Sequence, residues 1–172
     1  MRQAGHGDGL VCESVLRLPK QAAGILLYRQ SPGGLEVLLA HPGGPLWSRK
    51  DLGAWTIPKG QFGQEESALD AAKREFHEEM GSPAEGEFVE LGSIRQPSGK
   101  IVHAFTAESD FDVTQVKSNL FTLEWPPRSG RTGQYPEVDR AEWFSIDEAR
   151  RKILKGQEPF LDRLLALTAT AT

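Results

Sequence analysis

Apolar, β-branched stretches between Gly- and Pro-rich segments predict most of the strands. Residues 22–28 have the composition of a buried strand, and residues 35–40 of a second one. The Ser31-Pro32-Gly33-Gly34 segment between them is typical of a turn, so the two strands form a predicted hairpin. The same criteria predict further strands at 55–57, 88–95, 101–107, 120–125 and 141–146.

Residues 66–80 carry the clearest helical pattern. Leu69, Ala72, Phe76 and Met80 recur at helical spacing and form an apolar stripe, and Gly81 then occupies the position of a helix C-terminal cap. Two more helices are predicted at 147–154 and 159–167, and the Gly- and Pro-rich segments 41–50 and 126–136 are predicted loops. Strands, a helix, strands and then helices make the expected fold class α+β.

The length of 172 residues favours one domain. We expect a flexible N-terminal extension at 1–19, a single domain at 20–167 and a C-terminal tail at 168–172. No apolar run approaches the roughly 20 residues that span a bilayer. The net charge of −4 speaks against a duplex nucleic-acid partner. The single cysteine, Cys12, has no internal disulfide partner, which favours a reducing cytoplasm.

Three glutamates lie on one sector of the predicted helix at 100° per residue. Glu79 borders the apolar stripe, and Glu75 and Glu78 lie progressively farther from it. The repulsion between neighbouring carboxylates costs about 1 kcal/mol per pair at a water-like dielectric. A divalent cation bound between them replaces this repulsion with attraction. Oxygen ligands suit Mg²⁺ or Mn²⁺. The alternative is a solvated acidic face, which is the usual role of a charge run.

The residues around these glutamates follow a longer pattern. Gly60 is followed after five residues by Glu66 and after seven more by Arg74-Glu75-Phe76-His77-Glu78-Glu79-Met80-Gly81. This segment resembles the Nudix box, and every fixed position matches. The one departure is Ser82, where the family usually has an aliphatic residue. The chain is thereby identified as a member of the MutT-like Nudix hydrolases.

The resemblance implies an α/β/α sandwich with a mixed sheet. It implies Mg²⁺ or Mn²⁺ bound by Glu75, Glu78 and Glu79, with Glu75 and Glu78 also counted among the catalytic residues. It further implies that Glu66 and Arg74 form a bracing salt bridge.

The glycines Gly60 and Gly81, at the two ends of the box, would permit tight turns. Outside the box, Lys59 in Pro58-Lys59-Gly60 resembles the lysine of diadenosine tetraphosphate hydrolases and could sit beside a phosphate. Its alternative role is an ordinary surface lysine.

The resemblance implies one further carboxylate from outside the box, as a catalytic base or a metal ligand. Glu137 is the first choice, because it precedes Trp143-Phe144 as such a glutamate does in several Nudix relatives, and Glu124 and Glu142 are rivals. A structural role for Glu137 stays open.

Two aromatic residues, Trp47 and Tyr135, are candidates for stacking on a base, with packing as the alternative role for each.

The expected function is therefore hydrolysis of a pyrophosphate bond in a nucleoside polyphosphate, either a dinucleoside polyphosphate or a nucleoside triphosphate, by metal-activated water. ADP-sugars and RNA 5′ ends are alternative substrates. A hypothesis of another class is a non-catalytic nucleotide-binding regulatory module, but such modules are expected to lose the glutamates that this chain keeps. The resemblance leaves both a monomer and a homodimer open.

Overall fold

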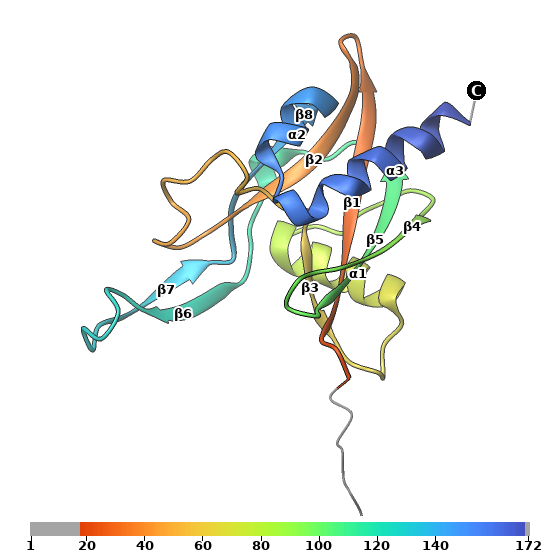
Figure 1. Cartoon of the computed structure of the whole chain (residues 1–172). Coiled ribbons are helices and arrows are strands. Elements are labelled where there is room, and N and C mark those ends of the chain that lie inside the picture. Colours follow the sequence, from red (N-terminus) through yellow and green to blue (C-terminus); the bar gives the residue numbers. More distant parts are fainter. Residues whose placement is uncertain (1–17, 171–172) are drawn as a thin grey trace, which may run out of the picture.

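The computed structural model describes residues 18–170, so most of the expected N-terminal extension lies outside the described residues. The fold contains one six-stranded sheet, which helices cover, and a separate two-stranded sheet that projects from it (Figure 1). In chain order the elements are β1 (Gln21–Ser31), β2 (Gly34–Pro42), β3 (Lys59–Phe62), α1 (Ala68–Met80), β4 (Val89–Arg95), β5 (Ile101–Glu108), η1 (Val113–Gln115), β6 (Leu120–Glu124), β7 (Thr132–Pro136), β8 (Val138–Ser145), α2 (Ile146–Lys152), η2 (Lys155–Gln157) and α3 (Glu158–Ala169).

Strand β1 is the centre of the six-stranded sheet, whose order is β4-β5-β1-β2-β8. It pairs antiparallel with β2 across the predicted hairpin, where Gln30 faces Leu35. It pairs parallel with β5 along its other edge. The short strand β3 pairs antiparallel with the first part of β1, where Gly60 faces Ala23. The sheet is therefore mixed, as predicted.

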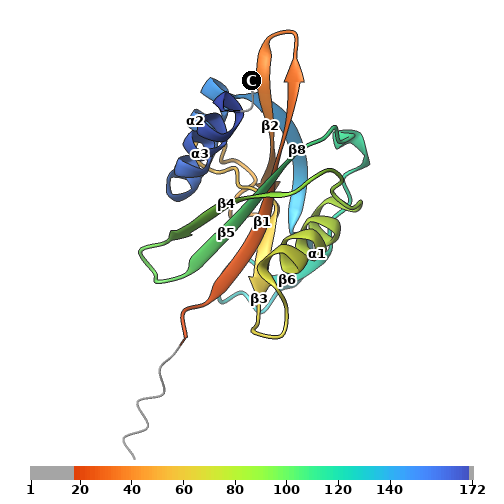
Figure 2. The same cartoon turned by 90° about the vertical axis from the view of Figure 1, so that its right-hand side faces the viewer.

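Helices cover both faces of this sheet, with α1 on one side and α2 and α3 on the other (Figure 2). The alternation of side chains along β1 explains how one strand serves both layers. Ile25 and Leu27 are buried in the core that contains Phe76 of α1, whereas Leu26 is buried in the core that contains Phe160 of α3. The α+β sandwich predicted from the sequence is confirmed.

Strands β6 and β7 form a hairpin that pairs only with itself and projects beside the 43–50 loop (Figure 1). The prediction of a loop at 126–136 was wrong in its last part, because β7 occupies Thr132–Pro136. Pro126, Pro127 and Gly130 form the turn before β7, whereas Gly133 and Pro136 lie within the strand. Within β7, backbone pairing with β6 outweighs the weak strand propensity of Gly133.

The predicted strand at 55–57 was also wrong. This segment forms only isolated bridges, between Thr56 and Ala40 and between Trp55 and Ile153. The short strand in this region is instead β3, which the sequence pattern did not reveal because Lys59-Gly60-Gln61 is not apolar.

The last helix runs to Ala169, so it includes the first two residues of the expected tail. Among the described residues, no helix combines the length and apolar character needed to cross a membrane.

Candidate active site

Helix α1 positions the three glutamates, and its ends are set by local chemistry. Ser67 caps the N-terminus, where its hydroxyl accepts a hydrogen bond from the Asp70 N–H at 3.1 Å. Gly81 ends the helix in the left-handed conformation, with φ 83°, and its N–H donates to the His77 carbonyl. The predicted helix therefore starts two residues later than expected and ends where expected.

The glutamates are buried in the order that their helical angles predict. Glu79 is only 9% exposed and lies next to Met80 in the core. The Glu75 side chain is 12% exposed and that of Glu78 is 41% exposed. The three carboxylates therefore extend from the protein interior to its surface along one side of α1.

Strand β3 lies against the buried end of this series. The Lys59 backbone N–H donates to Glu79 Oε2 at 2.9 Å. A Cβ atom on Gly60 would lie only 2.0 Å from the Glu75 carboxylate, so a side chain at this position would displace Glu75. The expectation that Gly60 permits a tight turn is corrected: Gly60 lies in a strand, and its importance is the close approach of the Glu75 carboxylate to the backbone.

The expected ion pair between Arg74 and Glu66 is present and bidentate. Arg74 Nε and Nη2 each donate to a Glu66 oxygen at 2.9 Å. The remaining nitrogen, Nη1, donates to Glu75 at 2.8 Å and to Glu78 at 3.2 Å. Hydrogen bonding to Glu66 is the main cause of the raised pKa of Arg74, and the same bond lowers the pKa of Glu66.

Burial is the main cause of the raised pKa values of two glutamates of α1. Burial raises the pKa of Glu79 to about 8, and the negative charges of Glu75 and Glu137 add to this shift, while the Lys59 N–H opposes it. Burial also raises the pKa of Glu75, although Arg74 opposes the shift. The site therefore holds more carboxylates than its local cations balance, which is the electrostatic condition that favours a bound divalent cation.

Within residues 18–170, no three acidic, histidine or cysteine side chains already converge as ligands of a single ion. Arg74 Nη1 holds both Glu75 and Glu78, and Glu79 is turned toward the backbone of β3. Because Arg74 binds Glu66 through Nε and Nη2, that brace does not depend on the Nη1 contacts.

A cavity of about 240 Å³ brings together four residues that the sequence singled out. Lys59, Glu79, Glu137 and Trp47 all line it, although they come from β3, α1, the β7–β8 junction and the 43–50 loop. Burial lowers the pKa of the Lys59 ammonium, and the nearby Lys100 adds to this effect, while Glu79 and Glu75 oppose it. A lysine and carboxylates thus share one cavity, as a phosphate and a cation together require.

Glu137 is held by its backbone at the point where β7 passes into β8. Its N–H donates to the Asn119 carbonyl at 2.9 Å, and its carbonyl accepts from the Gly43 N–H at 3.0 Å. Its two rivals lie elsewhere. Glu124 ends β6 opposite Thr132, and Glu142 lies on β8, 3.8 Å from the Arg140 guanidinium. Neither lines a cavity that contains a box glutamate.

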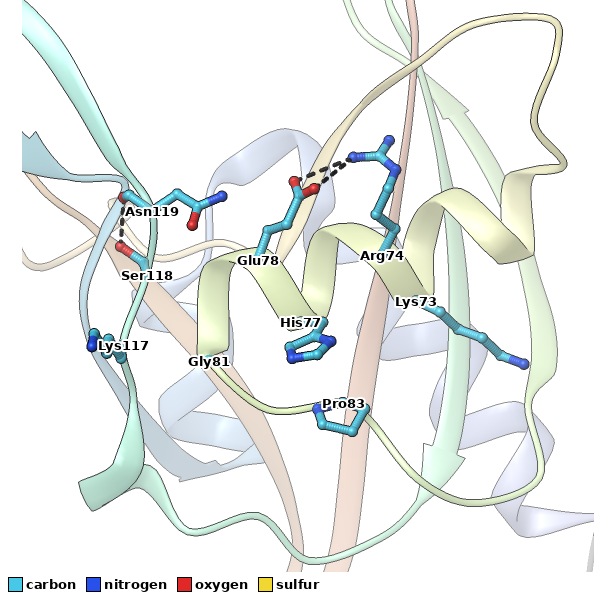
Figure 3. A pocket seen from close by; sticks show the side chains of 9 residues that line it. All are labelled: Lys73, Arg74, His77, Glu78, Gly81, Pro83, Lys117, Ser118 and Asn119. Atoms are coloured by element: carbon cyan, nitrogen blue, oxygen red, sulfur yellow. Dashed lines mark hydrogen bonds and ion pairs between the residues drawn. The ribbon is translucent and has the colours of Figure 1, made fainter.

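Glu78, the most exposed of the three glutamates, lines a second cavity, of about 640 Å³. Figure 3 shows Glu78 beside Arg74 and near Asn119, a residue that sequence reasoning missed. Lys73, in the middle of α1, and Lys117, beyond its C-terminus at Gly81, also line this cavity and lie on opposite sides of His77 (Figure 3). The cations of this cavity therefore do not converge on one point.

Of the two aromatic candidates, only Trp47 lines a cavity next to the glutamates. Tyr135 instead packs against Phe121, with ring centroids 6.1 Å apart, and lines none of the cavities described for residues 18–170. Phe121 had not been singled out, because a single Phe in a predicted strand carries no signal of its own.

Solved structures share this fold. The Caenorhabditis elegans Ap4A hydrolase, in a binary complex, is 23% identical and has a TM-score of 0.60, with 88% of this chain and 98% of that chain covered. The Nudix domain of Shewanella oneidensis NrtR, in complex with ADP ribose, is 13% identical with a TM-score of 0.64, covering 91% and 92%. The Mycobacterium smegmatis Nudix hydrolase RenU is 26% identical with a TM-score of 0.55, covering 88% and 87%.

No curated protein matches the sequence significantly. The model of one family, the NUDIX domain, matches residues 18–164, which include every strand and all of the site described above. With this match over most of its length, and with the box glutamates on α1 in the order of burial that their spacing predicts, the chain belongs to the Nudix family.

Proposed function

We propose that this protein is a divalent-metal-dependent hydrolase that cleaves a pyrophosphate bond in a nucleoside polyphosphate. The observation that carries the proposal is the cavity in which Lys59 lies beside Glu79 and Glu137. Burial raises the pKa of Glu79 to about 8 even though Lys59 opposes the shift, so a bound divalent cation would further favour its ionised form.

The donor set fits Mg²⁺ or Mn²⁺, because Glu75, Glu78 and Glu79 present oxygen atoms only. These three residues would hold the metal, which when bound lowers the pKa of a coordinated water and neutralises phosphate charge. If Glu75 and Glu78 bound a metal in place of Arg74 Nη1, Arg74 would keep its bidentate bond to Glu66, and the loop before α1 would stay braced.

The remaining residues act on the substrate. Glu137 accepts the proton of the water that attacks one phosphorus atom, and the bond from that phosphorus to the bridging oxygen breaks. The leaving phosphate departs with the bonding electron pair. Lys59 places a positive charge beside the phosphate chain, where it offsets the charge that develops on the phosphate oxygens.

The substrate class is proposed to be dinucleoside polyphosphates and nucleoside triphosphates. The fold neighbours support a nucleotide, since one is an Ap4A hydrolase and another was solved with ADP ribose. Nucleoside diphosphates linked to a sugar are the second candidate, because the NrtR Nudix domain was solved with such a molecule.

A substrate screen with product identification tests the proposal. Dinucleoside polyphosphates, nucleoside triphosphates, ADP-sugars and 5′-triphosphorylated RNA are incubated with Mg²⁺, with Mn²⁺ and with EDTA. We expect turnover of a nucleoside polyphosphate that EDTA abolishes. Absence of turnover across the whole panel with either metal would refute the enzyme and favour a nucleotide-binding regulatory module.

Matched variants assign the roles. Glu78→Gln and Glu137→Gln should each lower kcat by about 100-fold or more, in line with the loss of a metal ligand or a general base. Glu124→Gln is the control, because this glutamate ends the projecting hairpin strand β6. If Glu124→Gln lowers kcat as much as Glu137→Gln does, the assignment of the base is wrong.

A cytoplasmic location completes the proposal as an inference from the sequence. The resemblance leaves a monomer and a homodimer open, and sedimentation velocity of the purified chain distinguishes them.

A further inference from the structure

A third cavity, of about 390 Å³, adjoins the one that contains Lys59 and Glu79. Pro42, Trp47 and Glu137 line both, so the two share a wall. This third cavity is hereafter called the side pocket. Its volume lies in the range of small-molecule sites. A group attached to a phosphate chain at Lys59 would therefore reach the side pocket past Glu137.

The side pocket has the chemistry of a site for an apolar, flat group. The 43–50 loop supplies Leu46 and Trp47 on one side, and β6 supplies Phe121 and Leu123 on the other. Glu137, at the shared wall, is its one ionisable lining residue within the described chain. Phosphates and other anions are therefore poor occupants, and an uncharged ring is a good one.

Two glycines allow the loop and the hairpin to approach this closely. A Cβ atom on Gly43 would lie 1.9 Å from the Pro136 carbonyl oxygen, and one on Gly44 would lie 2.9 Å from the Phe121 ring. Gly44 also has φ +93°, which disfavours any side chain. The positions of Trp47 and Phe121 therefore depend on specific residues of the loop, which a chance surface hollow would not require.

The two aromatic walls are supported from behind. His41 is fully buried, and its Nδ1 is 2.9 Å from Asp139 Oδ1 while its Nε2 is 2.6 Å from the Lys50 carbonyl oxygen. These bonds tie the end of the Trp47 loop to β8. On the other side, Tyr135 packs against Phe121. Trp47 also packs against the core cluster, so each ring already has contacts within the fold, and such preorganisation lowers the entropic cost of binding.

We propose that the side pocket binds the base of the nucleotide substrate and that Phe121 and Leu123, with Trp47, select for a planar ring. This inference rests on the proposed function for the identity of the ligand. Aromatic walls favour a ring over an aliphatic chain of equal area, because two stacked rings attract each other beyond the effect of their buried area. Tyr135 then acts as a positioning residue for Phe121.

Calorimetric titration with two probes tests the pocket without requiring turnover. AMP and ribose 5-phosphate carry the same phosphate and sugar, and only AMP carries a base. We expect the wild-type protein with Mg²⁺ to bind AMP at least 10-fold more tightly than ribose 5-phosphate. Phe121→Ala and Leu123→Ala should each reduce this ratio by about 5- to 10-fold while the affinity for ribose 5-phosphate stays constant.

Leu120→Ala is the matched control. Leu120 is the neighbouring residue of the same strand, is 58% exposed and does not line the side pocket. It should leave the ratio unchanged. Circular dichroism and thermal melts establish that each variant is folded. Phe121→Leu keeps an apolar side chain but removes the ring, and it too should lower the ratio.

The outcomes separate the two proposals. An AMP preference that all three lining variants leave unchanged overturns the side-pocket inference, whatever the activity. A full preference in Phe121→Leu, together with tight binding of geranyl phosphate, overturns the ring selection in favour of an aliphatic occupant. A base preference that Phe121→Ala removes supports the inference even if no pyrophosphate is cleaved, in which case only the proposed function fails.

Discussion

Replacement of Glu79 by Gln should stabilise the metal-free protein while abolishing its hydrolase activity. Glu79 is 9% exposed, and burial raises its pKa from 4.5 to about 8. Between these two pH values the folded protein keeps the proton and the unfolded chain has lost it. Unfolding therefore releases a proton in this window, and the free energy of unfolding falls as the pH rises.

Titration of this single carboxyl lowers the free energy of unfolding by about 1.4 kcal/mol per pH unit. From pH 5 to pH 7.5 the metal-free wild type should therefore lose about 3 kcal/mol of stability that Glu79→Gln does not lose. Glutamine also preserves the bond at β3, because its carbonyl oxygen can accept from the Lys59 N–H as Glu79 Oε2 does at 2.9 Å. Above pH 8 both folded and unfolded states are ionised, and the difference should level off.

Urea unfolding in EDTA, measured at half-unit steps from pH 5 to pH 8.5, gives the free energy of unfolding against pH for the wild type and for Glu79→Gln. Glu124→Gln, on the hairpin, controls for the loss of one negative charge. Addition of Mg²⁺ at pH 7.5 should stabilise the wild type and leave Glu79→Gln nearly unchanged, because a ligand that binds only the folded state adds to its stability. Parallel curves for wild type and Glu79→Gln in EDTA would refute the reasoning, since Glu79 would then carry no energetic cost of burial.

Three further substitutions test the geometry around α1. Gly60→Ala should lower kcat by at least 10-fold without preventing folding, because its Cβ would lie 2.0 Å from the Glu75 carboxylate; unchanged kinetics would show that Glu75 can move without consequence. Arg74→Lys should lower both kcat and the melting temperature, because lysine cannot form the bidentate bond to Glu66, and a double-mutant cycle with Glu66→Gln should reveal the coupling. Gly81→Ala should destabilise the fold by about 1–2 kcal/mol in urea, because its φ of +83° is strained for alanine, while the KM for substrate stays constant.

Much of helix α1, which carries the box glutamates, could be predicted from the sequence because its determinants are local. The apolar stripe fixes which side of α1 faces the sheet, so the order of burial of Glu79, Glu75 and Glu78 follows from helical geometry alone. The β1–β2 hairpin is local in the same sense, because its turn residues lie between its two strands. The Arg74–Glu66 pair spans only eight residues.

The tertiary structure decided what surrounds that helix. Glu79 meets a backbone N–H 20 residues away, and Gly60 meets the Glu75 carboxylate, only because β3 pairs with β1 beside α1. The strand character of β7 likewise comes from pairing with β6, which overrides its own weak propensity.

The lining of the cavities shows most clearly which features the sequence predicts and which only the tertiary structure determines. Lys59, Trp47 and Glu137 can each be named from the sequence, but their common cavity depends on a loop, a strand and a β-junction meeting in space. The sequence could not predict that Phe121 lines the side pocket or that Tyr135 packs against Phe121. A side chain's role in a pocket depends on which residues face it across the fold. Periodicity along the chain determines which side of an element is buried, and only long-range packing determines what that side meets.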